Sequence, residues 1–412
     1  MASMLAPIEV DELPAAQRSL RIALVTETYP PEVNGVSLTL QRVVEGLRAR
    51  HHDIQLIRPR QTSADTALRQ ERFQEVLMRG MPIPRYPDLK MGLPSKKALI
   101  ALWSLHRPDL VHIATEGPLG WSALQVAQRL KLPVCSDFRT NFHAYSRHYG
   151  IAWLYRPIIA YLRKFHNRTA FTMVPTEALK RELQQGGFER LVVVTRGVDT
   201  TLFDPAHRSD ALRRNWGAEP ATRVALFVGR LAPEKNLGAL AGAFRAMRQV
   251  DPAMRLVVVG DGPARAELQE SVPDAVFAGT RYREDLAAHY ASADLFVFPS
   301  MTETFGNVTT EAMASGLPVL AFDHAAAGQL IRSGDNGLLA RLGDLPDYLH
   351  HAARLARDRD AATLMGQRAR RTVRELGWER IAAQVESVFL GTLAGKQPHQ
   401  AGSIARAVAR AA

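Results

Sequence analysis

The chain has 412 residues, of which 46% are hydrophobic and 23% are charged. These proportions are ordinary for a globular protein of two or three domains, so they exclude a coiled coil, a collagen and a wholly disordered chain. The chain holds 52 Lys and Arg against 41 Asp and Glu, a formal net charge of +11. This excess favours an anionic partner, either nucleic acid, an acidic lipid headgroup or a phosphorylated small molecule.

Short apolar, β-branched runs alternate with helical patterns along most of the chain. In the first half the predicted strands are residues 22–25, 54–57, 110–113, 134–135, 171–174 and 191–194. In the second half they are residues 223–228, 256–259, 275–277, 295–298 and 318–321. Predicted helices between them include residues 38–50, 238–250, 264–271 and 284–293. This alternation predicts parallel sheets with helices on both faces.

The strand pattern begins twice, with RIALVT at 21–26 and with RVALFV at 223–228. We therefore predict an N-terminal extension, two doubly wound domains, a C-terminal helix and a flexible basic tail. Their predicted bounds are residues 1–19, 20–197, 198–375, 376–394 and 395–412. Two such domains that face each other place a ligand cleft at the carboxyl ends of their strands.

Several gross features indicate a cytoplasmic protein. Cys135 is the single cysteine, so no intramolecular disulfide can form. Residues 1–20 lack the apolar stretch of a secretory signal, and no run of 18 uncharged apolar residues is present. We therefore expect no membrane-spanning segment, although the protein can still lie on a membrane surface.

The predicted strand 295–298 leads into a loop and helix that carry Glu303 and Glu311. Gly306 between them allows a close backbone approach, and the helix that begins there offers free N–H groups to a phosphate. Glu303 is placed to accept hydrogen bonds from sugar hydroxyls, and Glu311 from a ribose diol. Either carboxylate alone is more typical of a solvated surface, so the binding site is indicated by their combination after one strand.

The string ETFGNVTTEAMASGLP, which begins at Glu303, resembles the hallmark of the retaining glycosyltransferases of family 4. That family includes phosphatidylinositol mannosyltransferases and sulfoquinovosyl- and glucosyl-diacylglycerol synthases. The resemblance implies an α/β protein of the GT-B fold, with two facing Rossmann-like doubly wound parallel-sheet domains and a cleft between them. It also implies that the helix over 376–394 crosses back to the first domain. On this string the expected donor-binding residues are Thr304, Phe305, Gly306, Asn307 and Glu311. Glu303 belongs with His143, Arg230 and Lys235 to the expected catalytic residues.

The loop GRLAPEKNL after the predicted strand 223–228 carries Arg230 and Lys235. Two cations at the start of a helix suit a diphosphate whose charge grows as it leaves, although an isolated pair is more typical of a solvated loop. The string fits the diphosphate clamp of the family, so the resemblance assigns both residues to the donor diphosphate. It also places the nucleobase near Arg281, held largely by backbone groups.

Two first-domain segments carry further candidates. In relatives, a glycine-bearing loop near the donor phosphates stands where this chain has Asn34 and Gly35, and we expect Asn34 to tolerate the positive φ of that turn. His143 matches the active-site histidine of the family and is expected to contact the donor sugar or to shape the acceptor pocket. Weaker acceptor-side candidates are Arg139, Tyr145 and His148.

A retaining transfer has an oxocarbenium-like transition state, so stabilisation of the leaving group is the main requirement. Arg230, Lys235 and the helix end at Gly306 supply it, and we therefore expect neither a metal nor a cofactor. The resemblance implies front-face attack, in which the acceptor hydroxyl gives its proton to the leaving phosphate. Glu303 and Glu311 are then donor binders rather than a glycosidase pair.

Positive charge gathers in two first-domain segments. Residues 141–170 hold five Arg or Lys, no Asp or Glu, and interleaved aromatic residues, and residues 79–97 form an expected basic loop. Such stretches suit an anionic bilayer surface, although aromatic residues at helical spacing are equally typical of a core. We expect a lipid acceptor and a peripheral location on the inner face of the cell membrane.

Other interpretations stay open. The same chemistry fits a soluble or polysaccharide-precursor acceptor, whereas a nucleic-acid-binding protein would need a recognisable module that the sequence lacks. An epimerase or phosphorylase of the same fold would lack the paired glutamates. The expected donor is GDP-mannose or a UDP-hexose, and Arg283 weakens the GDP case because some guanine-specific relatives have a carboxylate there. The oligomeric state is not predicted.

Overall fold

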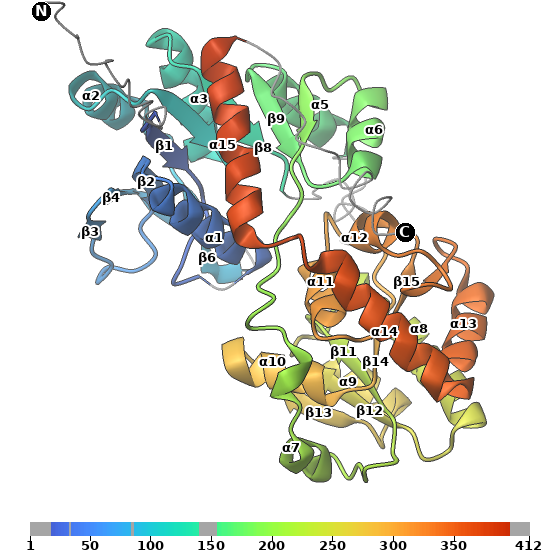
Figure 1. Cartoon of the computed structure of the whole chain (residues 1–412). Helices are drawn as coiled ribbons and strands as arrows, with labels where there is room; N and C mark the ends of the chain where they lie inside the picture. The colour runs from blue at the N-terminus through green and yellow to red at the C-terminus, as the bar shows by residue number, and fades with distance from the viewer. Residues whose placement is uncertain (1–17, 33, 84–85, 140–154, 396–412) are drawn as a thin grey trace, which may run out of the picture.

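The structure is a computed structural model that describes residues 18–32, 34–83, 86–139 and 155–395. Two separate sheets, parallel except for one antiparallel edge strand in the first, are each flanked by helices and form two Rossmann-like domains (Figure 1). The alternation of strands and helices in the sequence predicts this arrangement. Within the described residues, no helix has both the length and the apolar character needed to cross a bilayer.

The first sheet has eight strands in the order β10-β9-β8-β7-β1-β2-β4-β3. Its strands are β1 (Arg21–Val25), β2 (Asp53–Pro59), β3 (Arg69–Gln70), β4 (Phe73–Met78), β7 (Leu110–Ile113), β8 (Val134–Asp137), β9 (Phe171–Val174) and β10 (Leu191–Val193). The helices around it are α1 (Gly35–Ala49), α2 (Lys96–Leu105), α3 (Pro118–Arg129), α5 (Tyr155–His166) and α6 (Glu177–Gln185). From β1 the chain adds β2 and β4 on one side of the sheet and then β7 and β8 on the other. The loop after β1 therefore lies at the switch point where such sheets bind ligands.

The expectation of a loop over residues 79–97 is wrong. Strands β5 (Gly80–Ile83) and β6 (Tyr86–Gly92) pair there as an antiparallel ribbon. The segment is rich in proline, which argues against a central strand because proline cannot donate to a ladder. A two-stranded ribbon tolerates proline, since each strand has a partner on one side only.

The second sheet has six parallel strands in the order β13-β12-β11-β14-β15-β16. Its strands are β11 (Val224–Val228), β12 (Arg255–Val259), β13 (Val276–Gly279), β14 (Leu295–Phe298), β15 (Val319–Phe322) and β16 (Gly337–Ala340). The helices of this part are η2 (Pro205–His207), α7 (Asp210–Asn215), η3 (Pro233–Lys235), α8 (Leu237–Val250), α9 (Arg265–Ser271), α10 (Arg283–Ser292), α11 (Asn307–Ala314), α12 (Ala325–Leu330), α13 (Leu345–Arg357) and α14 (Arg359–Val373). The switch point lies between β11 and β14, the two strands that precede the Arg230 loop and the Glu303 loop.

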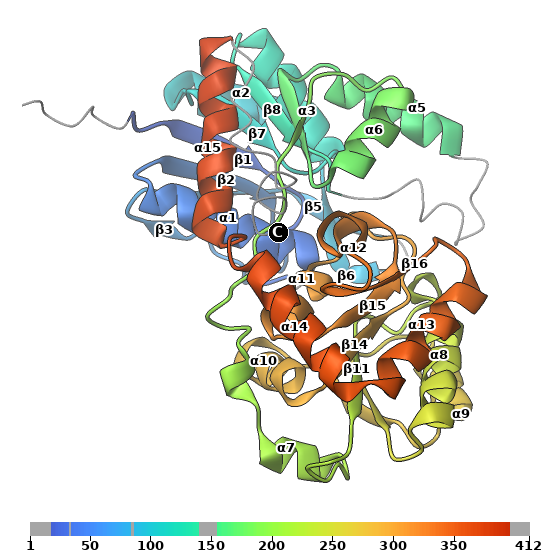
Figure 2. The same cartoon turned by 45° about the vertical axis from the view of Figure 1, so that its right-hand side comes forward.

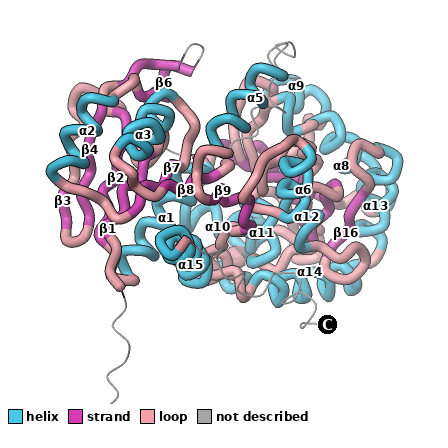
Figure 3. The backbone as a smooth tube through the Cα atoms, turned by 90° about the horizontal axis from the view of Figure 1, so that it is seen from above, coloured by secondary structure: helices cyan, strands magenta, loops and turns pink. Residues whose placement is uncertain are grey.

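The last described helix, α15 (Trp378–Ala394), packs on the first domain although it follows the second in the chain (Figures 1 and 3). Val385, Val388 and Phe389 are buried in the same cluster as Ile22 and Leu24 of β1. Removing each of these side chains from water contributes roughly 1.5–3 kcal/mol to stability. Polar contacts add specificity, because the Thr392 hydroxyl lies 2.8 Å from Cys135 Sγ.

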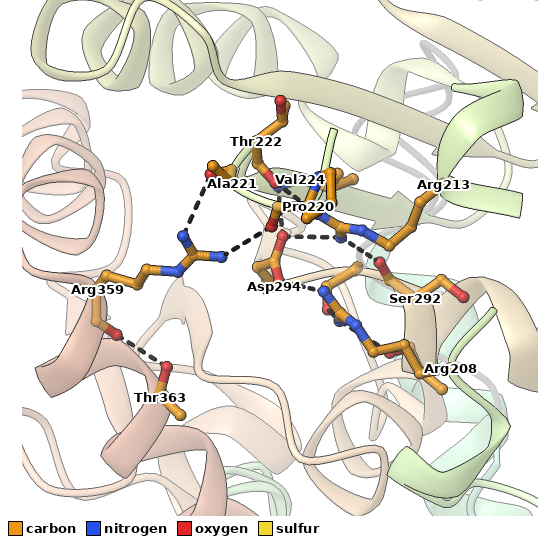
Figure 4. A network of polar contacts seen from close by, with 12 residues as sticks. Arg208, Arg213, Pro220, Ala221, Thr222, Val224, Ser292, Asp294, Arg359 and Thr363 are labelled. Atoms are coloured by element: carbon orange, nitrogen blue, oxygen red, sulfur yellow. Dashed lines mark hydrogen bonds and ion pairs between the residues drawn. The ribbon is translucent and has the colours of Figure 1, made fainter. Parts of the chain in front are cut away.

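A polar network holds the segment that enters the second domain, around η2 and α7, to the amino-terminal edge of the second sheet (Figure 4). The buried Arg213 donates to the carbonyl of Ser292 at 2.7 Å and to Asp294 Oδ2 at 3.0 Å. Asp294 also accepts from the backbone N–H of Val224 (2.8 Å) and from Arg208 (2.9 Å). This network lies at the starts of β11 and β14, so it anchors the domain and leaves the carboxyl edge to the loops described below.

Candidate active site

Three loops of the second domain meet at the carboxyl edge of its sheet. The backbone N–H of Gly229 donates to Val259 O at 3.0 Å, and that of Leu231 to Asp261 O at 3.0 Å. Gly260 has a φ of +131°, and a Cβ there would lie 2.0 Å from Gly229 O. Only glycine allows this approach, so the GDGP turn after β12 holds the Arg230 loop close to the sheet.

Lys235 and Glu303 form an ion pair across two of these loops. Their side chains are 15% and 18% exposed, and the Ser300 hydroxyl also donates to Glu303 Oε1 at 2.8 Å. Burial raises the pKa of Glu303, but Lys235 and Ser300 outweigh it, so the net shift is downward. Glu303 is therefore ionised at neutral pH, and a phosphate that reaches Lys235 has to compete with this carboxylate.

Glu311 lies in the second turn of α11 and has the opposite shift. Burial raises its pKa to about 7, and a hydrogen bond from the Tyr290 hydroxyl to Glu311 Oε2 (2.9 Å) partly offsets that rise. Tyr290 comes from α10 and is fully buried. Tyr290 was not among the predicted site residues, because an aromatic residue in a helical pattern is typical of the core.

The N-terminus of α11 is arranged for an anion. Gly306 caps the helix with a φ of +90°, no side chain caps it, and its first turn holds no acidic residue. Free N–H groups and the positive end of the helix dipole therefore face a ligand. Thr304 and Asn307 are partly exposed beside Gly306, whereas the Phe305 ring is 2% exposed in the core. Only the backbone of Phe305 is therefore accessible to a nucleotide-sugar donor.

Arg230 and Arg281 lie at the same edge as the paired glutamates. Arg230 is exposed on the loop after β11. Arg281 donates through Nε to Ala278 O at 2.9 Å and through Nη1 to Asp285 at 3.1 Å. Its side chain thus ties the loop after β13 to the first turn of α10, which leaves the backbone of this loop for a base.

The expectation of a positive φ at Asn34 is wrong. Asn34 is extended, with a φ of −151°, and it caps α1 because its Oδ1 accepts from Val36 N and Ser37 N. A side-chain cap satisfies the N-terminal N–H groups without any unusual backbone. Gly35 is the first residue of α1, and a Cβ on it would meet nothing within 4 Å, so open space lies beside this helix end.

Glu27 is a partly buried carboxyl that was not among the predicted site residues. It accepts hydrogen bonds from Gly92 N and from Leu119 N, the latter at 3.1 Å, at the start of α3. Burial raises the pKa of Glu27 to about 7, although these backbone hydrogen bonds oppose the rise. Its place in the loop after β1 was visible in the sequence, but its burial was not.

The first-domain candidates divide into two groups. His143, Tyr145 and His148 lie outside the described residues. Arg139 is described and buried, and it donates through Nε to Asp137 Oδ2 at 2.6 Å. Asp137 also lies 3.1 Å from His112 Nε2, so the end of β8 carries a compact ionic cluster.

Comparisons with known proteins agree with this geometry. Residues 33–202 match the family described as Glycosyltransferase Family 4, and residues 222–358 match Glycosyl transferases group 1. A GDP-mannose-dependent alpha-mannosyltransferase of Mycobacterium tuberculosis (strain CDC 1551 / Oshkosh) is 37% identical over 367 residues, which cover 87% of this chain and 93% of that protein. The chain belongs to the family 4 glycosyltransferases.

More distant relatives extend this similarity. An alpha-monoglucosyldiacylglycerol synthase of Streptococcus pneumoniae (strain ATCC BAA-255 / R6) is 27% identical over 76% of this chain and 73% of that protein. The solved structure of a sucrose-phosphate synthase from Thermosynechococcus elongatus superposes with a TM-score of 0.76, over 92% of this chain and 100% of that one, at 20% identity. The predicted GT-B fold and the prediction of a glycosyltransferase are confirmed.

Proposed function

We propose that this glycosyltransferase moves a hexose, with retention, from a nucleotide sugar to a lipid acceptor at the cytoplasmic face of the membrane. The observation that carries the proposal is the convergence of Lys235, Glu303 and Glu311 at the uncapped N-terminus of α11. A diphosphate fits the cation and the helix end, and the two carboxylates on either side suit sugar and ribose hydroxyls.

In the proposed reaction, Lys235 and Arg230 neutralise the diphosphate as its bond to the sugar breaks. Phosphate binding at Lys235 would loosen the ion pair with Glu303, whose carboxylate would then accept from hydroxyls of the transferred sugar. The acceptor hydroxyl attacks the same face of the sugar and gives its proton to the leaving phosphate oxygen.

The donor we propose is GDP-mannose. Support comes from the mycobacterial relative, whose name states that donor and which covers most of this chain. A thermal-shift and donor-hydrolysis screen with GDP-mannose, UDP-glucose, UDP-glucuronate and UDP-sulfoquinovose tests it. Preference for any UDP-sugar would overturn the donor assignment and leave the transferase chemistry standing.

Lys235→Ala and Glu311→Ala test the site itself. Lys235→Ala should lower the rate of transfer by at least roughly a hundredfold, because removing a group that stabilises the transition state costs about 2.7–4 kcal/mol. Glu311→Ala should also abolish most of the transfer, because it removes the carboxylate that holds the donor ribose. Circular dichroism and the unfolding temperature should show an intact fold. Full activity in either variant would contradict the assignment.

We propose that the transferase needs no metal. In the described part of the chain, no group of three or more His, Cys, Asp or Glu residues is placed to hold a metal ion. The sequence does contain a D-x-D string at residues 358–360, of the kind that binds metal in other glycosyltransferases, but Asp358 there caps α14 by accepting from Ala361 N at 2.9 Å. Undiminished transfer after dialysis against EDTA is the expected result.

The proposed membrane contact is the exposed face of α5. Arg156, Arg163 and Lys164 are exposed on it, whereas Phe165 is fully buried. The aromatic residues of this helix are therefore divided between core and surface, and Tyr161, at 38% exposure, lies on the surface. A basic helix face with an exposed tyrosine suits an anionic bilayer.

Vesicle sedimentation tests this contact. The protein should bind vesicles that contain phosphatidylglycerol, release them at high salt, and lose binding when Arg156, Arg163 and Lys164 are changed to Gln. Changing the partly exposed Lys180 and the exposed Arg181 of α6 to Gln is the control. Absence of binding at low salt would favour a soluble acceptor.

A further inference from the structure

A pocket in the first domain is lined by no residue of the loops that carry Lys235 and Glu303. It is bounded by the carboxyl ends of β8, β9 and β10 and by side chains of α1 and α15, the helix that Figure 2 shows along this domain. The polar residues that line it are Thr39, Asp137, Arg139, Thr195 and Arg196. Neither Thr195 nor Arg196 has a part in the proposed chemistry above.

Arg196 is a buried cation with little compensation. Its residue is 6% exposed. Among the described residues, its guanidinium donates to Thr39 Oγ1 at 3.1 Å and lies within ion-pair distance of no carboxylate. Burial lowers the pKa of Arg196 to about 9, and the charge of Arg139 acts in the same direction. A buried charge without a contacting counter-ion is costly, so an anion that enters the pocket would recover free energy.

The nearest acid, Asp137, is already occupied. It accepts from Arg139 Nε at 2.6 Å and lies 3.1 Å from His112 Nε2. Thr195 adds a hydroxyl whose oxygen is buried and has no hydrogen-bond partner in the described part of the chain. The pocket therefore combines an uncompensated guanidinium with an unused hydroxyl, which are both donors to an oxyanion.

The pocket also lies towards the donor site. Arg196 follows β10, at the point where the chain leaves the first domain, and the carboxylate of Glu303 in the second domain is close enough to raise the pKa of Arg196. An anion held here would lie on the first-domain side of the transferred sugar, which is the side from which an acceptor hydroxyl has to arrive.

We propose that Arg196 and Thr195, beside Arg139, form an anion subsite that binds a phosphate group of the acceptor headgroup. This inference rests on the proposed function for the identity of the acceptor, but the subsite itself does not depend on it. Two hydrogen bonds from a guanidinium to a phosphate would make it selective for an anionic over a neutral headgroup.

Thermal unfolding with inorganic phosphate tests whether the subsite exists. A Lys235→Ala background weakens the competing response of the diphosphate site. In it, phosphate should raise the unfolding temperature, since a ligand that binds only the folded state stabilises it. Adding Arg196→Met should abolish this rise and leave the phosphate-free unfolding temperature equal or higher, because a buried charge is gone.

Two further variants keep the result interpretable. Arg181→Met removes the same charge from an exposed position on α6, and it should keep the full phosphate response. Arg196→Lys, which retains the charge but not the planar donor pair, should show a reduced response. An equal phosphate response with and without Arg196 would overturn the proposal.

Kinetics with an acceptor distinguish the source of the phosphate. With a phosphatidyl acceptor, Arg196→Met should raise the acceptor KM roughly tenfold or more, as loss of a charge-assisted hydrogen bond does, with a much smaller change in the donor KM. An Arg196-dependent phosphate response with no change in acceptor KM would support a site for free phosphate and overturn its assignment to the acceptor. If no lipid accepts a sugar, the proposed function fails, but the phosphate response still decides the subsite.

Discussion

Glu303 and Glu311 lie on one loop and helix, yet their environments drive their protonation in opposite directions. Glu303 is held ionised by Lys235 and Ser300. The pKa of Glu311 is raised to about 7 by burial, with only the Tyr290 hydroxyl against it. One carboxylate is therefore charged and the other is close to half-protonated at neutral pH.

This difference predicts a proton release on nucleotide binding. A ribose diol that donates to Glu311 favours its charged form and lowers its pKa, so a fraction of a proton should leave near pH 7. Calorimetry with GDP in two buffers of different ionisation enthalpy measures it. Glu311→Gln should abolish the release, and Glu303→Gln should retain it because that carboxylate is already ionised.

The raised pKa of Glu311 also makes the stability of the folded protein depend on pH. The folded state binds the Glu311 proton more tightly than the unfolded chain does, so its contribution is fully present below the ordinary pKa of 4.5 and is lost as the pH rises towards about 7. A pH profile of the unfolding temperature for wild type and Glu311→Gln should therefore diverge above pH 4.5. Parallel profiles would mean that burial does not raise the pKa of Glu311.

At the scale of the elements, α15 is the helix that completes the first domain. It packs so closely on α1 that a Cβ on Gly46 would lie 2.5 Å from the Cβ of Ala382. The length and position of this helix could be predicted from its periodicity and from the family resemblance. The contact at Gly46 could not, because a glycine within a helical pattern indicates only a weak helix position.

Gly46→Ala should therefore destabilise the protein by about 1–3 kcal/mol, as overpacking does, although alanine is the better helix former. Gly238→Ala in α8 is the matched control, because a Cβ there would meet nothing within 4 Å. It should be neutral or stabilise by up to about 1 kcal/mol. Chemical denaturation of both variants provides the measurement, and equal effects would contradict the close packing of α15.

At the scale of the whole molecule, the chain passes between the domains twice, and the two passages touch. The backbone N–H of Val198 donates to Leu376 O at 2.9 Å. A Cβ on Gly197 would lie 2.6 Å from the ring of Trp378, so the indole packs directly on the backbone of the first passage. The relative placement of the two domains depends on this junction.

Gly197→Ala should push the Trp378 ring away. We expect a large loss of kcat/KM with only a small fall in the unfolding temperature, since misplacement of reacting groups slows transfer steeply. Gly377→Ala at the second passage is the control, because a Cβ there meets nothing within 4 Å. Steady-state kinetics beside thermal unfolding separate the two effects. Normal kinetics in Gly197→Ala would show that the junction tolerates the extra methyl group.

The sequence by itself determined the α/β class, the two Rossmann-like domains and the positions of Glu303, Glu311 and Lys235 in the loops after the strands. Strand and helix periods and loop motifs are local, so they are legible along the chain. The tertiary structure alone decided which groups meet and how deeply they are buried. Three contacts join segments that lie apart in the chain: the ion pair of Lys235 with Glu303, the hydrogen bond from the Tyr290 hydroxyl to Glu311, and the hydrogen bond from the buried Arg196 to Thr39. Their protonation and their chemistry follow from burial, which no local pattern encodes.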